Sequence, residues 1–128
     1  MESKYSRNDL AISILKQIED AIERLQERTK SIKSVDDFLC SSSGMEKLDA
    51  TCMLLIAIGE SLKSFDKITE KKILCQDESI PWSDIMGVRD IIAHHYFHID
   101  AEEIFNIISN DLDPLHESIR NFLFELGR

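Results

Sequence analysis

The stretch AISILKQIEDAIERL, residues 11–25, sets the fold class of this chain. Its apolar side chains recur at steps of three and four residues, the interval that places side chains on one face of an α-helix. These apolar residues are Ala11, Ile14, Leu15, Ile18, Ala21, Ile22 and Leu25. The positions between them carry charge, at Lys16, Glu19, Asp20 and Glu23. The pattern predicts an amphipathic helix over about residues 7–33 with one buried stripe.

A second long helix is expected to follow a short turn. Ser34 is suited to cap a turn over residues 35–39, and Ser43 with Glu46 matches a capping box that would open the long helix. This helix should end near Phe65. Its centre, residues 50–58, is apolar nearly all the way round, so it must be covered on more than one side. It is therefore either the central helix of a bundle or part of a dimer interface.

The remaining third of the chain also has helical signals. Pro81 suits the first turn of a helix over about residues 81–96, because its missing N–H is no loss there. The side chains expected to point inward are Trp82, Ile85, Val88 and Ile92. Asp100 is suited to cap the next helix, and Asp113 with Pro114 is expected to divide the final apolar stripe into two helices.

Few residues in this chain break helices, since it has four Gly and two Pro, and no stretch alternates as a strand would. The fold class predicted is all-α, an antiparallel bundle of four to five helices in a single domain over residues 1–128. The longest apolar run is far short of the ~20 residues that a membrane helix needs. With a polar start and three cysteines (Cys40, Cys52 and Cys75) that form no C-x-x-C pair, we expect a cytoplasmic protein with free thiols.

The net charge of −9 argues against polyphosphate binding over the whole surface. If the chain binds RNA, it must do so in a local cleft. One of the few locally basic segments contains Lys67, Lys71 and Lys72. Such a segment is either a solvated surface or a place that touches RNA or a partner protein.

The stretch PWSDIMGVRDIIAHHYFHID, residues 81–100, holds three of the four histidines and interrupts an otherwise apolar helix with polar residues. Taken alone, Arg89 could pair with Asp84 or Asp90, and His94 could be a hydrogen-bonded structural histidine. At about 100° per residue, His94 lies about 140° around the helix from Arg89, so a regular helix in one chain does not bring them together. His94, His98 and Asp100 could seed a metal site, but irregular backbone is expected there and His116 stands alone. We therefore expect no metal and no cofactor.

The same stretch resembles a known family. Arg89, four residues, His94, one residue and Tyr96 form the motif of the HepT-like branch of the HEPN superfamily, and the residues around it, MGVRD at 86–90 and YFHID at 96–100, agree. The pair Gly59-Glu60 and the stretch LDPL at 112–115 also resemble this branch.

The resemblance implies a metal-independent endoribonuclease, the toxin of a toxin–antitoxin system, whose active cleft forms at a homodimer interface. Arg89 would hold the scissile phosphate, His94 would act as general acid or base, and Asp90 would orient one of these or the RNA. The antitoxin would be a minimal nucleotidyltransferase that transfers AMP to Tyr96 (AMPylation) and so blocks the cleft. Two alternatives stay open: a catalytically silent helical partner that docks a nucleotidyltransferase, and a dimerisation module without chemistry.

Overall fold

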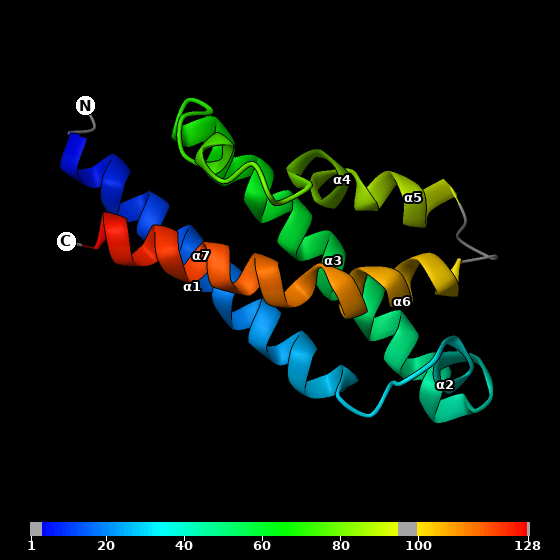
Figure 1. Ribbon diagram of the computed structural model, residues 1–128. Helices are drawn as coiled ribbons and strands as arrows, with labels where there is room; N and C mark the ends of the chain where they lie inside the picture. Colours follow the sequence, from blue (N-terminus) through cyan, green and yellow to red (C-terminus); the bar gives the residue numbers. More distant parts are fainter. Residues whose placement is uncertain (1–3, 95–99, 128) are drawn as a thin grey trace.

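The computed structural model describes residues 4–94 and 100–127, and within these residues all regular structure is helical (Figure 1). The all-α prediction is thus confirmed. The α-helices are α1 (Lys4–Thr29), α2 (Val35–Leu39), α3 (Ser42–Ile68), α4 (Trp82–Met86), α5 (Val88–His94), α6 (Ala101–Asn110) and α7 (Leu112–Leu126), with a 3₁₀ turn, η1, at Leu74–Gln76. The described part of the chain therefore has seven α-helices instead of four or five, because α2 is a true helix and the third predicted helix is divided.

Helix α3 is the centre of the molecule. It contacts α1, α2, α4, α5 and α6, while α7 packs on α1 (Figure 1). Thr51, Cys52, Leu55 and Ile58 of its apolar segment are buried by these neighbours. The segment thus belongs to the central helix of a bundle. Met53 protrudes from the same segment, with 68% of its surface exposed.

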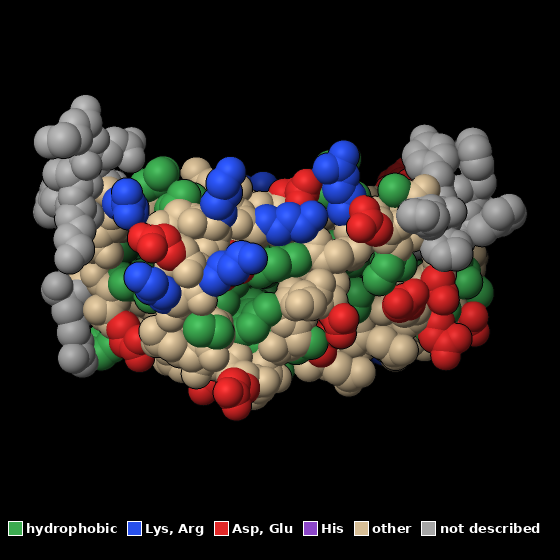
Figure 2. Space-filling model, turned by 90° about the horizontal axis from the view of Figure 1, so that it is seen from above, with side chains coloured by type: hydrophobic (Ala, Val, Ile, Leu, Met, Phe, Trp, Pro, Cys, Tyr) green, Lys and Arg blue, Asp and Glu red, His purple; other side chains and the backbone are tan. Residues whose placement is uncertain are grey.

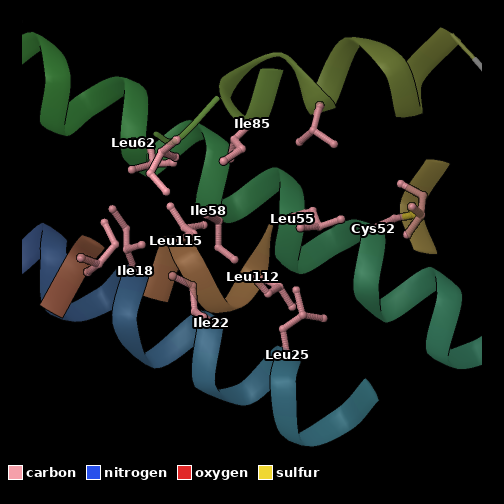
Figure 3. Packing of buried hydrophobic residues seen from close by; sticks show 14 of the residues in the cluster. Ile18, Ile22, Leu25, Cys52, Leu55, Ile58, Leu62, Ile85, Leu112 and Leu115 are labelled. Carbon is pink, nitrogen blue, oxygen red and sulfur yellow. The ribbon is translucent and has the colours of Figure 1, made fainter. Parts of the chain in front are cut away.

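The core forms where three long helices converge. Figure 3 shows side chains from α1, α3 and α7 meeting, with Ile85 of α4 closing one side. The predicted stripe of the first helix is confirmed, since it is buried at Ala11, Leu15, Ile18, Ile22 and Leu25. The ends of α1 and α7 lie together at one edge of the bundle, where Arg7 and Leu126 line the same surface groove.

The start of α3 differs from the prediction. The N-cap is Ser41, whose Oγ accepts a hydrogen bond from the Gly44 N–H at 2.9 Å, so the capping box expected at Ser43 and Glu46 is wrong. The reason is tertiary: a Cβ at position 44 would collide with the carbonyl oxygen of Asp37 in α2. Gly44 must therefore lie in the first turn, against α2. Ser34 precedes α2 as predicted, and its N–H donates to the Asp37 carboxylate at 3.2 Å.

The first helix ends at Thr29, four residues before the predicted end. The Thr29 hydroxyl donates to the carbonyl oxygen of Leu25, and the Ile32 N–H donates to the carbonyl oxygen of Thr29 at 2.9 Å. Ile32, which follows this turn, is buried.

The predicted helix over 81–96 is broken at Gly87, between α4 and α5. The side of this helix that was predicted to face inward is confirmed, because Ile85, Val88 and Ile92 are buried. Trp82 is half-buried; its indole N–H donates to the carbonyl oxygen of Asp77 at 2.9 Å, and its ring lies beside that of Phe122.

The last two helices meet at Asp111, two residues before the expected cap at Asp113. Asp100 caps α6 as predicted, accepting from the Glu103 N–H at 3.2 Å. The chain turns at Asp111, and α7 begins at Leu112, so Pro114 lies in its first turn. Asp113 does not cap α7; its carboxylate accepts from the side-chain amide of Gln26 in α1. Across the described ranges, none of the helices has the length and apolar character needed to cross a membrane.

Candidate active site

Arg89 is the second residue of α5 and is held at the surface by α3. Its Nη1 donates to Oε1 of Glu60 at 2.9 Å, and 61% of the Arg89 side chain is exposed. The ion-pair partner is thus a residue of α3, not the Asp84 considered from sequence. A guanidinium has five N–H donors in a planar fork. Only Nη1 is engaged by Glu60, so donors remain for a phosphate approaching from solvent.

Gly59 explains why Glu60 can reach Arg89. A Cβ at position 59 would lie 2.7 Å from the backbone carbonyl oxygen of Ile85, closer than real Cβ contacts allow. The missing side chain therefore lets α4 lie directly on α3. Gly59 sets how closely the α4–α5 segment approaches α3, and the next residue, Glu60, pairs with Arg89 of that segment.

The Glu60 carboxylate is shared between two cations. Its Oε2 lies 3.0 Å from Nζ of Lys63, one turn further along α3. Hydrogen bonds from Lys63 and Arg89 lower the pKa of Glu60 below its ordinary value of 4.5. Glu60 is consequently a carboxylate at neutral pH and orients Arg89 without taking up a proton.

Asp90 and His94 belong to the same helix as Arg89. Asp90 is exposed in the first turn of α5, and His94 is its last residue, so positions 90 and 94 lie on one helix face. Helix α5 is regular from 88 to 94, so the angular separation of positions 89 and 94 expected from sequence holds for the backbone. The His94 side chain and the residues His95, Tyr96 and His98 lie outside the described residues.

Sequence reasoning did not predict the ion pairs that join Arg89 to Glu60 and Glu60 to Lys63. Glu60 and Lys63 precede Arg89 by 29 and 26 positions, and no local pattern connects them. The resemblance of the Gly59-Glu60 pair to the HepT-like branch was the signal that could have identified the carboxylate.

One group of side chains in the described ranges could hold a metal ion. Glu19 and Glu23 of α1 and His116 of α7 have ligand atoms within 4.8 Å of one another. His116 Nε2 lies 3.2 Å from the Glu23 carboxylate, so the prediction that His116 stands alone is wrong. The group lies between α1 and α7, away from the α3–α5 contact that positions Arg89.

The cysteines are free, as predicted. Burial, with the nearby charge of Asp49, raises the pKa of Cys52 to about 11. Its thiol is therefore protonated at neutral pH and is not a nucleophile. Cys40 and Cys75 are exposed.

Comparison with known proteins identifies a family for this chain. Residues 18–122 match the family described as "Ribonuclease HepT-like". The chain is 29% identical to "Probable ribonuclease HepT" of Thermococcus cleftensis, covering 79% of this chain and 84% of that protein. It is 29% identical to a "Putative RNase" of Caldanaerobacter subterraneus subsp. tengcongensis, covering 85% and 90% of the two chains.

A longer relative occurs in Methanocaldococcus jannaschii, named "Gamma-glutamylcyclotransferase and putative RNase". The identity is 30% over 95% of this chain, which spans about half (51%) of that protein. No solved structure matches the chain. The family match covers most of the helices described above, including α3, α4 and α5, which hold Arg89 in place. By this match, the chain belongs to the ribonuclease HepT-like family.

Proposed function

We propose that this chain is a metal-independent endoribonuclease, the toxin of a toxin–antitoxin system, and that it acts in the cytoplasm as one helical domain. The observation that carries the proposal is the exposed Arg89, fixed by Glu60 at the start of the helix that ends with His94. An arginine with its guanidinium oriented in advance and open to solvent suits the binding of a phosphodiester.

The chemistry assigned to these residues needs no metal. Arg89 binds the scissile phosphate and stabilises the negative charge that builds on its oxygens. His94 acts as general base toward the ribose 2′-OH, or as general acid toward the leaving 5′ oxygen, because imidazole titrates near neutral pH. The 2′ oxygen attacks phosphorus as the bond to the 5′ oxygen breaks. Asp90, on the same helix face as His94, orients the reacting groups.

The active unit is proposed to be a homodimer. Met53, Ala57 and Glu60 occupy successive turns on one face of α3, and both Met53 and Ala57 are exposed. An exposed methionine on a central helix suits contact with a second protein surface. Since this apolar face runs directly to Glu60 and Arg89, pairing of two chains there would bring two copies of the motif to one cleft.

Control of the activity is assigned to Tyr96. A nucleotidyltransferase antitoxin would transfer AMP to its hydroxyl, and the added phosphate would compete with RNA for Arg89. Tyr96 follows Arg89 by seven positions in the sequence and lies outside the described residues.

One observation favours a second candidate function. Glu60 neutralises part of the charge of Arg89, and the chain as a whole carries −9. Both features suit a catalytically silent partner that binds a nucleotidyltransferase and never meets RNA.

Cleavage of RNA by the purified chain in EDTA distinguishes the ribonuclease from the catalytically silent partner. Wild type, Arg89→Ala and His94→Ala are compared, with intact mass confirming an unmodified Tyr96 and light scattering giving the oligomeric state. We expect cleavage by wild type alone, with all three proteins dimeric. Absence of cleavage by unmodified wild type would favour the silent partner, and a monomer that cleaves RNA would refute the shared cleft.

A further inference from the structure

A shallow groove of about 440 Å³ lies at the C-terminal end of α3. It is lined by Lys63, Asp66, Lys67, Glu70, Lys71 and Met86, and is called the basic groove below. Lys63 and Lys67 are one helical turn apart, with a rise of about 6 Å between them. Met86 comes from the last turn of α4, so the groove follows the contact between α3 and α4.

The basic groove is joined to Arg89 by ion pairs. Lys63 lies 3.0 Å from Glu60, and Glu60 lies 2.9 Å from Arg89. A ligand bound to Arg89 therefore has to extend along only one turn of α3, from Glu60 to Lys63, to enter the groove. In the two turns of α3 that precede Glu60, the exposed side chains are the apolar Met53 and Ala57, whereas the turns that follow Glu60 carry the lysines of the groove.

Of the two acids in the groove, Asp66 and Glu70, Glu70 is already paired with cations. Glu70 pairs with Arg7 at 3.3 Å and with Lys72 at 3.5 Å. Lys67 and Lys71, in contrast, form no ion pair with any residue in the described ranges. These two ammonium groups are available to an anion from outside.

The charge of this surface is opposite to that of the chain. The groove residues, together with the chain of ion pairs that runs from them to Arg89 and Arg7, comprise six cations and three acids: Arg7, Lys63, Lys67, Lys71, Lys72 and Arg89, against Glu60, Asp66 and Glu70. The surface carries a net positive charge, whereas the whole chain carries −9. Figure 2 looks onto the side of the molecule formed by the end of α3 with α4 and α5, and Lys and Arg side chains gather there in one region.

The end of α3 has an unusual backbone that contributes to this grouping. Glu70 and Lys71 both adopt left-handed conformations, with φ of 57° and 61°, although neither is glycine. The Lys71 N–H donates to the carbonyl oxygen of Asp66 at 2.8 Å. The chain thereby turns back on the last turn of α3, and Lys71 lines the groove with Lys63 and Lys67. Residues in this region of φ, ψ space carry strain, which the surrounding structure must hold.

We infer that the basic groove binds the sugar-phosphate backbone of single-stranded RNA next to the bond at Arg89. The inference rests on the proposed function and extends it, because it names the surface that holds RNA outside the cleavage site. Lysines bind phosphates without reading base sequence, so the contact is independent of sequence. Unpaired Lys67 and Lys71 hold phosphates, and Met86 offers an apolar surface to a ribose or base. An acidic protein partner could also bind lysines, but the continuity with Arg89 favours RNA.

The test compares two double variants with equal loss of charge. Lys67→Gln/Lys71→Gln removes the unpaired groove lysines. Lys16→Gln/Lys33→Gln removes two exposed lysines elsewhere that also form no ion pair in the described ranges. The dissociation constant of a 2′-O-methyl RNA oligonucleotide, which cannot be cleaved, is measured by fluorescence anisotropy at several salt concentrations. Cleavage of the unmodified RNA is measured in parallel, and melting curves check that each variant is folded.

We expect the groove variant to bind the oligonucleotide roughly tenfold more weakly at low salt, with the salt slope reduced by about 1.4, since each lost phosphate contact removes about 0.7 for single strands. KM for the cleaved RNA should rise while kcat changes little, and the control should match wild type. Equal losses in both variants, or none in the groove variant, would overturn the inference while the ribonuclease proposal stands. If wild type binds RNA through the groove but does not cleave it, the ribonuclease proposal is overturned and the groove inference stands. If wild type neither binds nor cleaves RNA, both are overturned.

Discussion

Replacing Gly59 by alanine tests the contact that positions Arg89. The new Cβ would begin 2.7 Å from the carbonyl oxygen of Ile85, and ordinary contact starts at 3.4 Å. The backbone of α4 must therefore withdraw by about 0.7 Å, the difference between these distances. Such overpacking of a buried contact costs about 1–3 kcal/mol. Alanine favours the helix over glycine by about 1 kcal/mol, which offsets part of that cost.

The net expectation is destabilisation by about 1 kcal/mol, equivalent to a fall in Tm of about 4 °C for a chain of this size. Since α5 follows α4 directly, Arg89 moves with it, and we expect RNA cleavage to fall by at least about tenfold because catalysis is sensitive to displacements of this order. Thermal unfolding followed by circular dichroism gives the first value, and cleavage rates below Tm give the second.

Position 64 supplies the matched control. Ser64 is exposed in the same helix, so Ser64→Ala should be more stable than Ser64→Gly by about 1 kcal/mol from helix propensity alone. At position 59 the order should be reversed, with glycine the more stable residue. If alanine stabilises the protein at both positions, α3 and α4 are not in the close contact described above, and the explanation of how Arg89 is held fails.

Three further results are expected. Glu60→Gln should leave Tm nearly unchanged, because the ion pair with Arg89 is exposed, yet it should reduce RNA cleavage by loosening Arg89; unchanged cleavage would show that Glu60 does not position it. Because hydrogen bonds hold the pKa of Glu60 below 4.5, its carboxylate contributes to stability above that pH and loses the contribution only as the pH falls through the lowered value. The pH profile of cleavage between pH 5 and 8 should thus keep its shape in Glu60→Gln, and a shifted acidic limb would contradict this. With a thiol reagent at pH 8, the two exposed cysteines should react in the native protein and Cys52 only after unfolding; rapid labelling of all three would disprove the burial of Cys52.

The sequence predicted what local spacing controls. The stripe from Ala11 to Leu25 required only the helical period, and the cap at Asp100 required only a side-chain oxygen before a free backbone N–H. The start of α3 was ambiguous, because three successive serines could each cap a helix. The contact of Gly44 with α2 resolves that ambiguity, and it is a tertiary contact that no local pattern contains.

For the candidate site too, the sequence predicted what a local motif contains and missed what depends on tertiary contacts. Arg89, Asp90 and His94 were identified by a short motif, and the structure places all three on α5. The pairing of Arg89 with Glu60 joins residues 29 positions apart and depends on how two helices pack. The roles of Arg89, Asp90, His94 and Tyr96 stay predictions.

The two ends of the described chain lie at one edge of the bundle, where Arg7 and Leu126 line a common groove. A short peptide could therefore join them, and the chain could be opened elsewhere as a circular permutant with the same helical packing. A second domain fused to either end would emerge at that edge without threading through the bundle. It would stand beside Glu70 and Lys72, which line the same groove at the end of α3. An affinity tag at either terminus would therefore sit closer to the lysine-rich end of α3 than to α5, so binding experiments call for tag-free protein.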